Sequence, residues 1–208
     1  MVIGLSGVAG AGKDLFASKL IEELESQGKT AIRVALADAL KKETRSWCEN
    51  HYKIDPISCP REDKEKIREF LVFHGTFKRR ASKGRHWVNT INDHVIKMNS
   101  VYDYVIVTDI RYNFYEKDEA FWIQKELQGK LIHISQYQMC SDVEEGALIR
   151  TVREPVNSEE RANDPRVKKD ADFLVEWEFI DENHPQFINK DKYLNNKVVS
   201  FIEWLNAQ

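Results

Sequence analysis

A glycine-rich stretch near the start of the chain has the spacing of a phosphate-binding loop. Residues 7–13 read Gly-Val-Ala-Gly-Ala-Gly-Lys and fit the pattern GxxxxGK, between an apolar run at 2–6 and a segment with helical spacing. Glycines let backbone N–H groups turn toward phosphate oxygens, the next helix adds the positive end of its dipole, and Lys13 supplies a mobile charge. This pattern predicts ATP binding, against the alternative of a glycine-rich turn with a surface lysine.

The residue after this lysine departs from the common pattern, because Asp14 stands where a serine or threonine hydroxyl normally binds Mg²⁺. A carboxylate also suits this hard cation, directly or through water. The alternative is that Asp14 only complements the helix dipole. We expect ATP and Mg²⁺ as cofactors, with ATP held by Gly7, Ala9, Gly10, Ala11, Gly12, Lys13 and Asp14.

Two further charged residues follow an apolar segment in the middle of the chain. Residues 104–107 are apolar and rich in β-branched types, as in a central parallel strand, and Asp109 and Arg111 follow them. Strand ends open into the ligand crevice of such sheets, so the two side chains could project a carboxylate and a guanidinium into one site. We expect Asp109, with Asp14, to be an acid associated with Mg²⁺. The alternative is a capping aspartate beside a surface arginine.

The segments that must position these residues alternate between strand and helix patterns. Apolar runs predict strands at 2–6, 32–36, 104–107, 131–134 and 173–175, and helical spacing predicts helices at 16–24, 37–51, 63–78, 88–98, 116–127, near 143–150, and at 194–205. This alternation indicates an α/β fold with a five-stranded, parallel, doubly wound sheet and flanking helices. We expect one domain over 1–208, with a helical insertion at about 38–100 and a mobile, solvated flap at about 142–170.

Composition narrows the class of protein. The 208 residues include 31 Lys and Arg against 34 Asp and Glu, a formal net charge of -3, which argues against a binder of nucleic-acid polymers. Hydrophobic content of 42% is too high for a disordered chain, and no apolar run approaches the roughly 18 residues of a membrane span. The odd cysteine count, without a CxxC pair, indicates neither a disulfide framework nor a zinc site. Because no signal-peptide pattern opens the sequence, we expect a cytoplasmic protein.

Together these elements resemble the deoxynucleoside monophosphate kinases known from phages, a branch of the P-loop nucleoside monophosphate kinases. The resemblance rests on Gly12-Lys13-Asp14, on Leu-Ala-Asp-Ala-Leu-Lys at 36–41, on the series Arg68, Gly75-Thr76 and Trp87, and on Asp109 and Arg111 followed by Glu116. Residues 163–173 also resemble the family's approach to its last strand. The chain departs from the family at Val72, where a glutamine that contacts the base is expected, and at Ala11 and Leu15 in the loop region.

The resemblance implies a P-loop NTPase fold in which the insertion binds the monophosphate and the flap is a lid over ATP. The implied reaction transfers a phosphoryl group from ATP to a deoxynucleoside monophosphate, in the host cytoplasm if the source is viral, and a homodimer stays open. The implied catalytic residues are Lys13, Asp14, Arg68 and Arg111. The expected substrate-binding residues are Asp38, Arg68, Gly75, Thr76, Arg79, Trp87, Asp109, Arg111 and Glu116, and Arg150 and Arg153 are candidate lid arginines that bind ATP.

Phosphoryl transfer depends on positioning and positive charge, so these arginines suit it, although each could instead lie on a solvated helix face. Trp87 could stack on the nucleotide or anchor the core, and we expect His74 to be a core histidine. Two other functions stay open. The chain could be a P-loop kinase of another phosphorylated small molecule, of the phosphomevalonate type, or a non-catalytic module that binds nucleotides or, through residues 78–87, nucleic acid.

Overall fold

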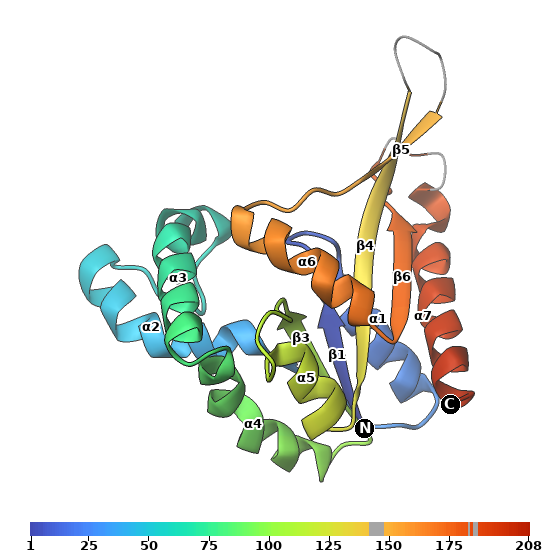
Figure 1. Cartoon of the computed structure of the whole chain (residues 1–208). Helices are drawn as coiled ribbons and strands as arrows, with labels where there is room; N and C mark the ends of the chain where they lie inside the picture. Colours follow the sequence, from blue (N-terminus) through green and yellow to red (C-terminus); the bar gives the residue numbers. More distant parts are fainter. Residues whose placement is uncertain (142–147, 183, 185–186) are drawn as a thin grey trace.

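The computed structural model describes every residue except 142–147, 183 and 185–186 (Figure 1). The strands are β1 (Val2–Ser6), β2 (Ala31–Ala35), β3 (Tyr104–Ile110), β4 (Lys130–Ser141), β5 (Leu148–Val152) and β6 (Phe173–Glu178). The helices are α1 (Lys13–Ser26), α2 (Leu36–Tyr52), α3 (Arg61–Ala81), α4 (Arg85–Asn99), α5 (Glu119–Phe121), α6 (Ser158–Asp170) and α7 (Lys190–Asn206). A π-helical turn covers Trp122–Glu126, and a 3₁₀ turn covers Phe187–Asn189.

These strands form one sheet within the described part of the chain. Five of them are parallel, in the order β2, β3, β1, β4, β6, and β5 pairs antiparallel with the second half of β4. The predicted α/β class and its five parallel strands are confirmed. Because β1 lies in the middle of the sheet, the loop that follows it opens at the centre of the carboxyl edge, where ligands bind in such sheets.

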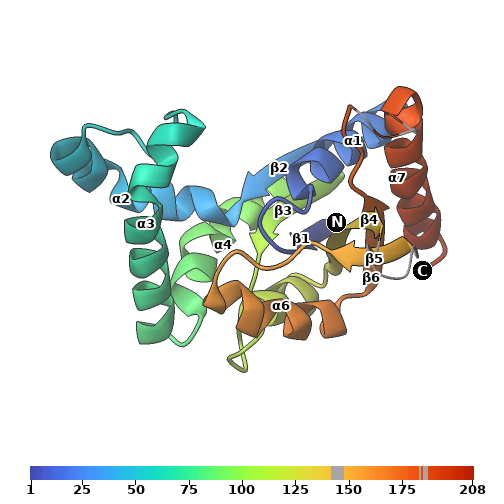
Figure 2. The ribbon, with the colours of Figure 1, turned by 90° about the horizontal axis from the view of Figure 1, so that it is seen from above.

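Helices cover both faces of the sheet, because successive strand residues point to opposite sides. On β1, Val2 joins a core with α4, α5 and the π-helical turn, whereas Ile3 and Leu5 join a second core with α1 and α7. Figure 2 shows α1 and α7 on one side of the sheet and α4 and α6 on the other. Each large apolar side chain buried this way contributes about 1.5–3 kcal/mol, so both faces fix the strand register.

The segment expected to be a helical insertion at 38–100 holds most of α2 and all of α3 and α4: α2 and α3 project to one side of the sheet (Figure 1), whereas α4 packs on a face of the sheet. A small core of its own joins α2 and α3 through Cys48, Ile67 and Leu71. His74, on α3, pairs with Glu43 of α2 at 2.8 Å, so it is satisfied as expected, but its side chain is half-buried and not fully within the core. The role of the insertion in substrate binding stays a prediction.

Two predicted helices are wrong in part. The helix expected at 116–127 begins only at Glu119, because the Asp118 side chain caps it and the preceding residues form a turn. Of the helix expected near 143–150, residues 142–147 lie outside the described part, and 148–150 belong to strand β5. The pairing of β5 with β4 decides its conformation, and local spacing does not reveal that partner.

Helix α6 was not expected within the segment 142–170, which reads as solvated and carries two prolines. Pro165 lies inside the helix, where it lacks an N–H to donate, and it is exposed. The helix nevertheless forms, because Glu160, Asn163 and Val167 are buried against the body of the protein. None of the described helices combines the length and apolar character that crossing a membrane requires.

Candidate functional site

The loop between β1 and α1 is fixed by close packing against β6. Gly12 has a φ of 88°, and a Cβ atom there would lie 2.2 Å from the Trp177 ring. The Trp177 indole N–H donates to the Ala11 carbonyl at 2.8 Å. Only glycine fits this position without displacing the indole, so the GxxxxGK spacing reflects both backbone conformation and packing.

Lys13 begins α1 and folds back over this loop. Its Nζ atom donates to the carbonyl oxygens of Gly7 and Val8, at 2.9 Å each, and the residue is only 6% exposed. Burial and, to a smaller extent, the nearby charge of Arg111 together lower the Lys13 pKa to about 8, against the opposing effect of Asp109. The loop thus holds a lysine at its mouth, and an anion that binds there would stabilise the charged form of this lysine.

The sequence predicts that this loop binds ATP, and the lowered Lys13 pKa predicts that such binding takes up protons. In the free protein Lys13 is partly neutral above pH 8, and bound phosphates favour its charged form, so the uptake should approach about one proton per ATP near pH 9. Calorimetric titration in two buffers of different ionisation enthalpy measures it. The variant Lys13→Arg, charged at every pH, should bind without this uptake. Binding enthalpies that do not depend on the buffer between pH 8 and 9 would show that Lys13 takes up no proton when ATP binds.

Asp109 and Arg111 meet at the end of β3, next to the loop. The pairing of β1 with β3 shifts register before Ser6 and Ile110, and Asp109 has a φ of 69°. Such a bulge re-aims side chains, and aspartate is one of the residues that tolerate this conformation. The Arg111 guanidinium lies 3.9 Å from the Asp109 carboxylate. The structure therefore brings Lys13, Asp109 and Arg111 together, as the sequence predicts.

Two buried acids hold the segment that carries Arg111. The Glu119 carboxylate accepts hydrogen bonds from the backbone N–H groups of Arg111 at 2.7 Å and Tyr112 at 3.1 Å. Asp118 accepts from Phe114 at 2.9 Å and caps α5. Burial and, to a smaller extent, the neighbouring charge of Asp118 together raise the pKa of Glu119 to about 8. Glu116, which the resemblance assigns to substrate binding, is exposed in the turn before these acids, and its role stays a prediction.

Because this pKa keeps much of Glu119 protonated at pH 7, a neutral amide should replace it well. We expect Glu119→Gln to change the free energy of unfolding by less than about 1 kcal/mol. Glu119→Ala leaves two backbone N–H groups without an acceptor and should cost about 3 kcal/mol. Urea denaturation of both variants at pH 7 makes the comparison. Equal destabilisation by the two substitutions would contradict this role.

Helix α6 and the segment before it lie over the loop. The Arg153 Nε atom donates to the Ala9 carbonyl at 3.0 Å. A lid role for Arg153 and its contact with ATP stay predictions. The Glu160 carboxylate accepts from the Ala9 N–H at 3.3 Å and pairs with the Arg111 guanidinium. Sequence reasoning missed Glu160 and Trp177, since nothing in the local spacing links them to the loop.

Other predicted residues have different surroundings. Arg68 is paired with Glu65 on α3, and Arg150 with Glu176 on β6. Arg79 is 4% exposed and pairs with buried Asp118. These arginines are therefore engaged with acids of the protein itself. Their predicted roles in substrate, ATP or phosphate binding stay predictions.

Trp87 is a core residue, as one of the two alternatives anticipated. It is buried in the cluster between the sheet and α4, and its indole N–H donates to the Gly75 carbonyl at 3.1 Å. Gly75 and Trp87 thus join α3 to α4, and the predicted roles of Gly75, Thr76 and Trp87 in substrate binding stay predictions. Stacking of Trp87 on a nucleotide would need this packing to open.

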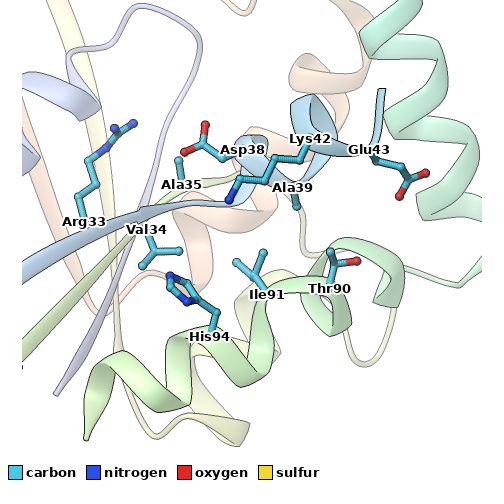
Figure 3. Close-up of a pocket in the computed structure, with 10 residues that line it drawn as sticks. All are labelled: Arg33, Val34, Ala35, Asp38, Ala39, Lys42, Glu43, Thr90, Ile91 and His94. Carbon is cyan, nitrogen blue, oxygen red and sulfur yellow. The ribbon is translucent and has the colours of Figure 1, made fainter. Parts of the chain in front are cut away.

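Asp38 lines a cavity of about 500 Å³ at the edge of the sheet (Figure 3). The walls come from β2, α2 and α4, through Arg33, Val34, Ala35, Asp38, Ala39, Lys42, Glu43, Thr90, Ile91 and His94. Figure 3 shows the Lys42 amine directed back toward the side of the cavity where Arg33 and His94 lie. Arg33 also pairs with Asp14 at 2.7 Å, which connects the cavity to the residue after Lys13.

The acids at the loop fit a magnesium ion that phosphates help to hold. Asp109 is partly exposed beside Lys13, whereas Asp14 is 77% exposed in its side chain and bound to Arg33. In the described part of the chain, no cluster of three His, Cys, Asp or Glu side chains could hold a metal by itself. Magnesium characteristically keeps one or two carboxylates and takes its other ligands from phosphate and water.

Neither a family profile nor a curated protein matches the sequence. Among solved structures, shikimate kinase from Bacteroides thetaiotaomicron is similar over 99% of this chain and 98% of that chain, with 12% identity and a TM-score of 0.46. Dephospho-CoA kinase from Campylobacter jejuni is similar over 98% and 96%, with 14% identity and a TM-score of 0.44. Shikimate kinase from Aquifex aeolicus covers 100% of both chains at 15% identity and a TM-score of 0.42. At these values, function has to be inferred from the chain's own residues.

Proposed function

We propose that this protein is a kinase that transfers a phosphoryl group from ATP to deoxynucleoside monophosphates. The convergence of Lys13, Asp109 and Arg111 at the mouth of the GxxxxGK loop carries the proposal. A loop of this kind binds the phosphates of a nucleotide, and an arginine beside it can stabilise the charge of a transferring phosphoryl group. The resemblance in sequence to deoxynucleoside monophosphate kinases supports the choice of acceptor.

In this reaction an oxygen of the acceptor phosphate attacks the γ-phosphorus of ATP. A new P–O bond forms, the bond from the γ-phosphorus to the β,γ-bridging oxygen breaks, and ADP leaves. Lys13 and the loop N–H groups hold the ATP phosphates, and Arg111 offers a planar fork to the transferring group or the acceptor. Magnesium, held by Asp109 with Asp14 nearby, would neutralise phosphate charge. The acceptor is mostly a dianion at pH 7, so no strong general base is needed.

The cavity beside β2 is the candidate acceptor site. Its volume lies within the range of about 300–1,000 Å³ that small-molecule sites occupy. Arg33, Lys42 and His94 offer positive or hydrogen-bonding groups there, next to Asp38. Within the described residues, the side chains of Lys42 and His94 form no hydrogen bond or ion pair. Both side chains are therefore available to an anionic ligand.

Lys42→Ala tests this acceptor site. We expect the KM for the monophosphate to rise about tenfold, because one charge-assisted contact is lost, while the KM for ATP stays within about twofold. Lys66→Ala, which removes an exposed lysine paired with Asp63 on α3, is the matched control. Steady-state kinetics with each substrate varied in turn give both constants. A change confined to the KM for ATP would place the acceptor elsewhere.

Turnover across a substrate panel tests the function. The purified protein is mixed with ATP, Mg²⁺ and each of dAMP, dGMP, dTMP and dCMP, the corresponding ribonucleotides, and phosphomevalonate, and ADP is measured by a coupled assay. ADP formation that depends on a deoxynucleoside monophosphate is the expected result. Turnover only with phosphomevalonate would indicate a different kinase. ATP binding without turnover on any acceptor would indicate a non-catalytic nucleotide-binding module.

A further inference from the structure

The first turn of α6 brings a carboxylate into the mouth of the phosphate-binding loop. One oxygen of Glu160 accepts from the N–H groups of Ala9 and Val156, at 3.3 Å each. The carboxylate also pairs with the guanidinium of Arg111, and the Glu160 side chain is only 7% exposed. A backbone N–H of the loop and an arginine fork are the donors that a phosphate oxygen would use.

The placement of this carboxylate is built into the fold. The Asn157 side chain caps α6 by accepting from the Glu160 N–H at 2.8 Å. Further along α6, Asp164 pairs with buried His133 of β4 at 3.0 Å. On the outer side, Glu159 pairs with Arg80 of α3. Because α6 is fixed on several sides, Glu160 is directed at the loop by the helix and not by chance on a free surface.

We propose that Glu160 occupies the place of a ligand phosphate in the free protein and is displaced when the phosphates bind. The proposal rests on the proposed nucleotide-binding function of the loop. The Ala9 N–H has a single proton to donate, and two anions cannot share the same donors without strong repulsion. An arriving phosphate therefore takes over the Ala9 N–H and Arg111, while the Glu160 side chain rotates away.

Two consequences follow for affinity and positioning. The carboxylate holds Arg111 at the site before ligand arrives, so Glu160 acts as a positioning residue. It also competes with the ligand, so removing its charge should tighten the binding of phosphates. A purely structural glutamate would behave differently, because its loss would lower stability and weaken binding together.

Calorimetry with inorganic pyrophosphate and with ATP tests the proposal on the full chain. We expect Glu160→Gln to bind both probes about tenfold more tightly than the wild type, as expected when one charge-assisted contact no longer has to be broken. Glu203→Gln, which changes an exposed glutamate of α7, is the control, and its affinities should equal those of the wild type. Equal or weaker binding by Glu160→Gln, with the wild type binding normally, would overturn the displacement.

A second variant guards against a folding defect. Glu160→Ala removes the side chain beyond its Cβ atom, and thermal melting of the free protein shows whether either variant remains folded. Tighter binding by a folded Glu160→Ala supports the proposal, and unchanged or weaker binding overturns it. If neither the wild type nor any variant binds ATP or pyrophosphate, the nucleotide-binding function itself fails, and the role of Glu160 fails with it.

Discussion

Lys13→Ala is expected to reduce kcat for phosphoryl transfer by at least about 10³-fold. The ammonium lies at the mouth of the loop, held by the carbonyl oxygens of Gly7 and Val8, and in the proposed reaction it supplies positive charge to the ATP phosphates. The coupled ADP assay at saturating ATP and acceptor measures the loss. Lys29→Ala, in the exposed turn after α1, is the control and should retain full activity.

The fold should survive this substitution. Burial lowers the Lys13 pKa to about 8, which shows that the charged lysine is disfavoured where it lies in the free protein. We therefore expect the melting temperature of Lys13→Ala to equal or exceed that of the wild type. Retention of more than about a tenth of the activity would contradict the assignment of the loop, given the losses that such contacts normally cause.

Arg111→Ala is expected to lower kcat/KM by about 10²–10³-fold, because it removes a planar fork from the site where charge develops. Arg111→Lys keeps the charge and loses the fork, so it should fall between the alanine variant and the wild type. Arg45→Ala provides a matched control, since Arg45 lies on the surface of α2 with Glu49 and Asp55 as partners. Steady-state kinetics on the three variants rank these effects.

The position of Arg111 gives this prediction a second readout. Its guanidinium pairs with Glu160 in the free protein, so Arg111→Ala leaves that carboxylate without its cationic partner. Without the arginine beside it, the Glu160 carboxylate should repel pyrophosphate more strongly than it does in the wild type, so the variant should bind pyrophosphate more weakly. An Arg111→Ala variant that keeps wild-type kcat/KM would exclude Arg111 from the reaction.

The strand, loop and helix around Lys13 could be predicted because their signals are local. An apolar run, glycines at fixed spacing and helical periodicity follow one another within 28 residues, and no distant partner is needed to form them. The same holds for Asp109 and Arg111, whose place at the end of a buried strand follows from the strand itself. Both predictions led to residues that do meet in the structure.

The contacts of Trp177 and Glu160 with the loop could not be predicted, because they reach it from the far end of the chain. Glu160 belongs to a charged segment with two prolines, and only burial against the body of the protein shows that it forms a helix. In the sequence, Trp177 looks like any other apolar residue of a strand, and only the structure shows that its ring packs against Gly12. Tertiary packing decides both positions, and local spacing carries no record of it.

Arg79 and Glu116 illustrate a related limit. Residue spacing shows that an arginine lies on a helix near other cations, but not that a buried aspartate 39 residues away pairs with it. Likewise, several acids follow Arg111, and only the turn before α5 determines that Asp118 and Glu119 point inward while Glu116 is exposed. A role that is assigned from residue type and position in the sequence therefore needs the residue's contact partner to be known.

Phosphorus NMR of a single reaction mixture tests the central claim most directly. The protein, ATP, Mg²⁺ and a deoxynucleoside monophosphate are incubated together, and the resonances of products are followed over time. The proposed function predicts that signals of ADP and of the deoxynucleoside diphosphate grow at equal rates, and that Lys13→Ala produces neither. ATP that stays intact with all four deoxynucleoside monophosphates, or that yields only ADP and inorganic phosphate, would contradict the account.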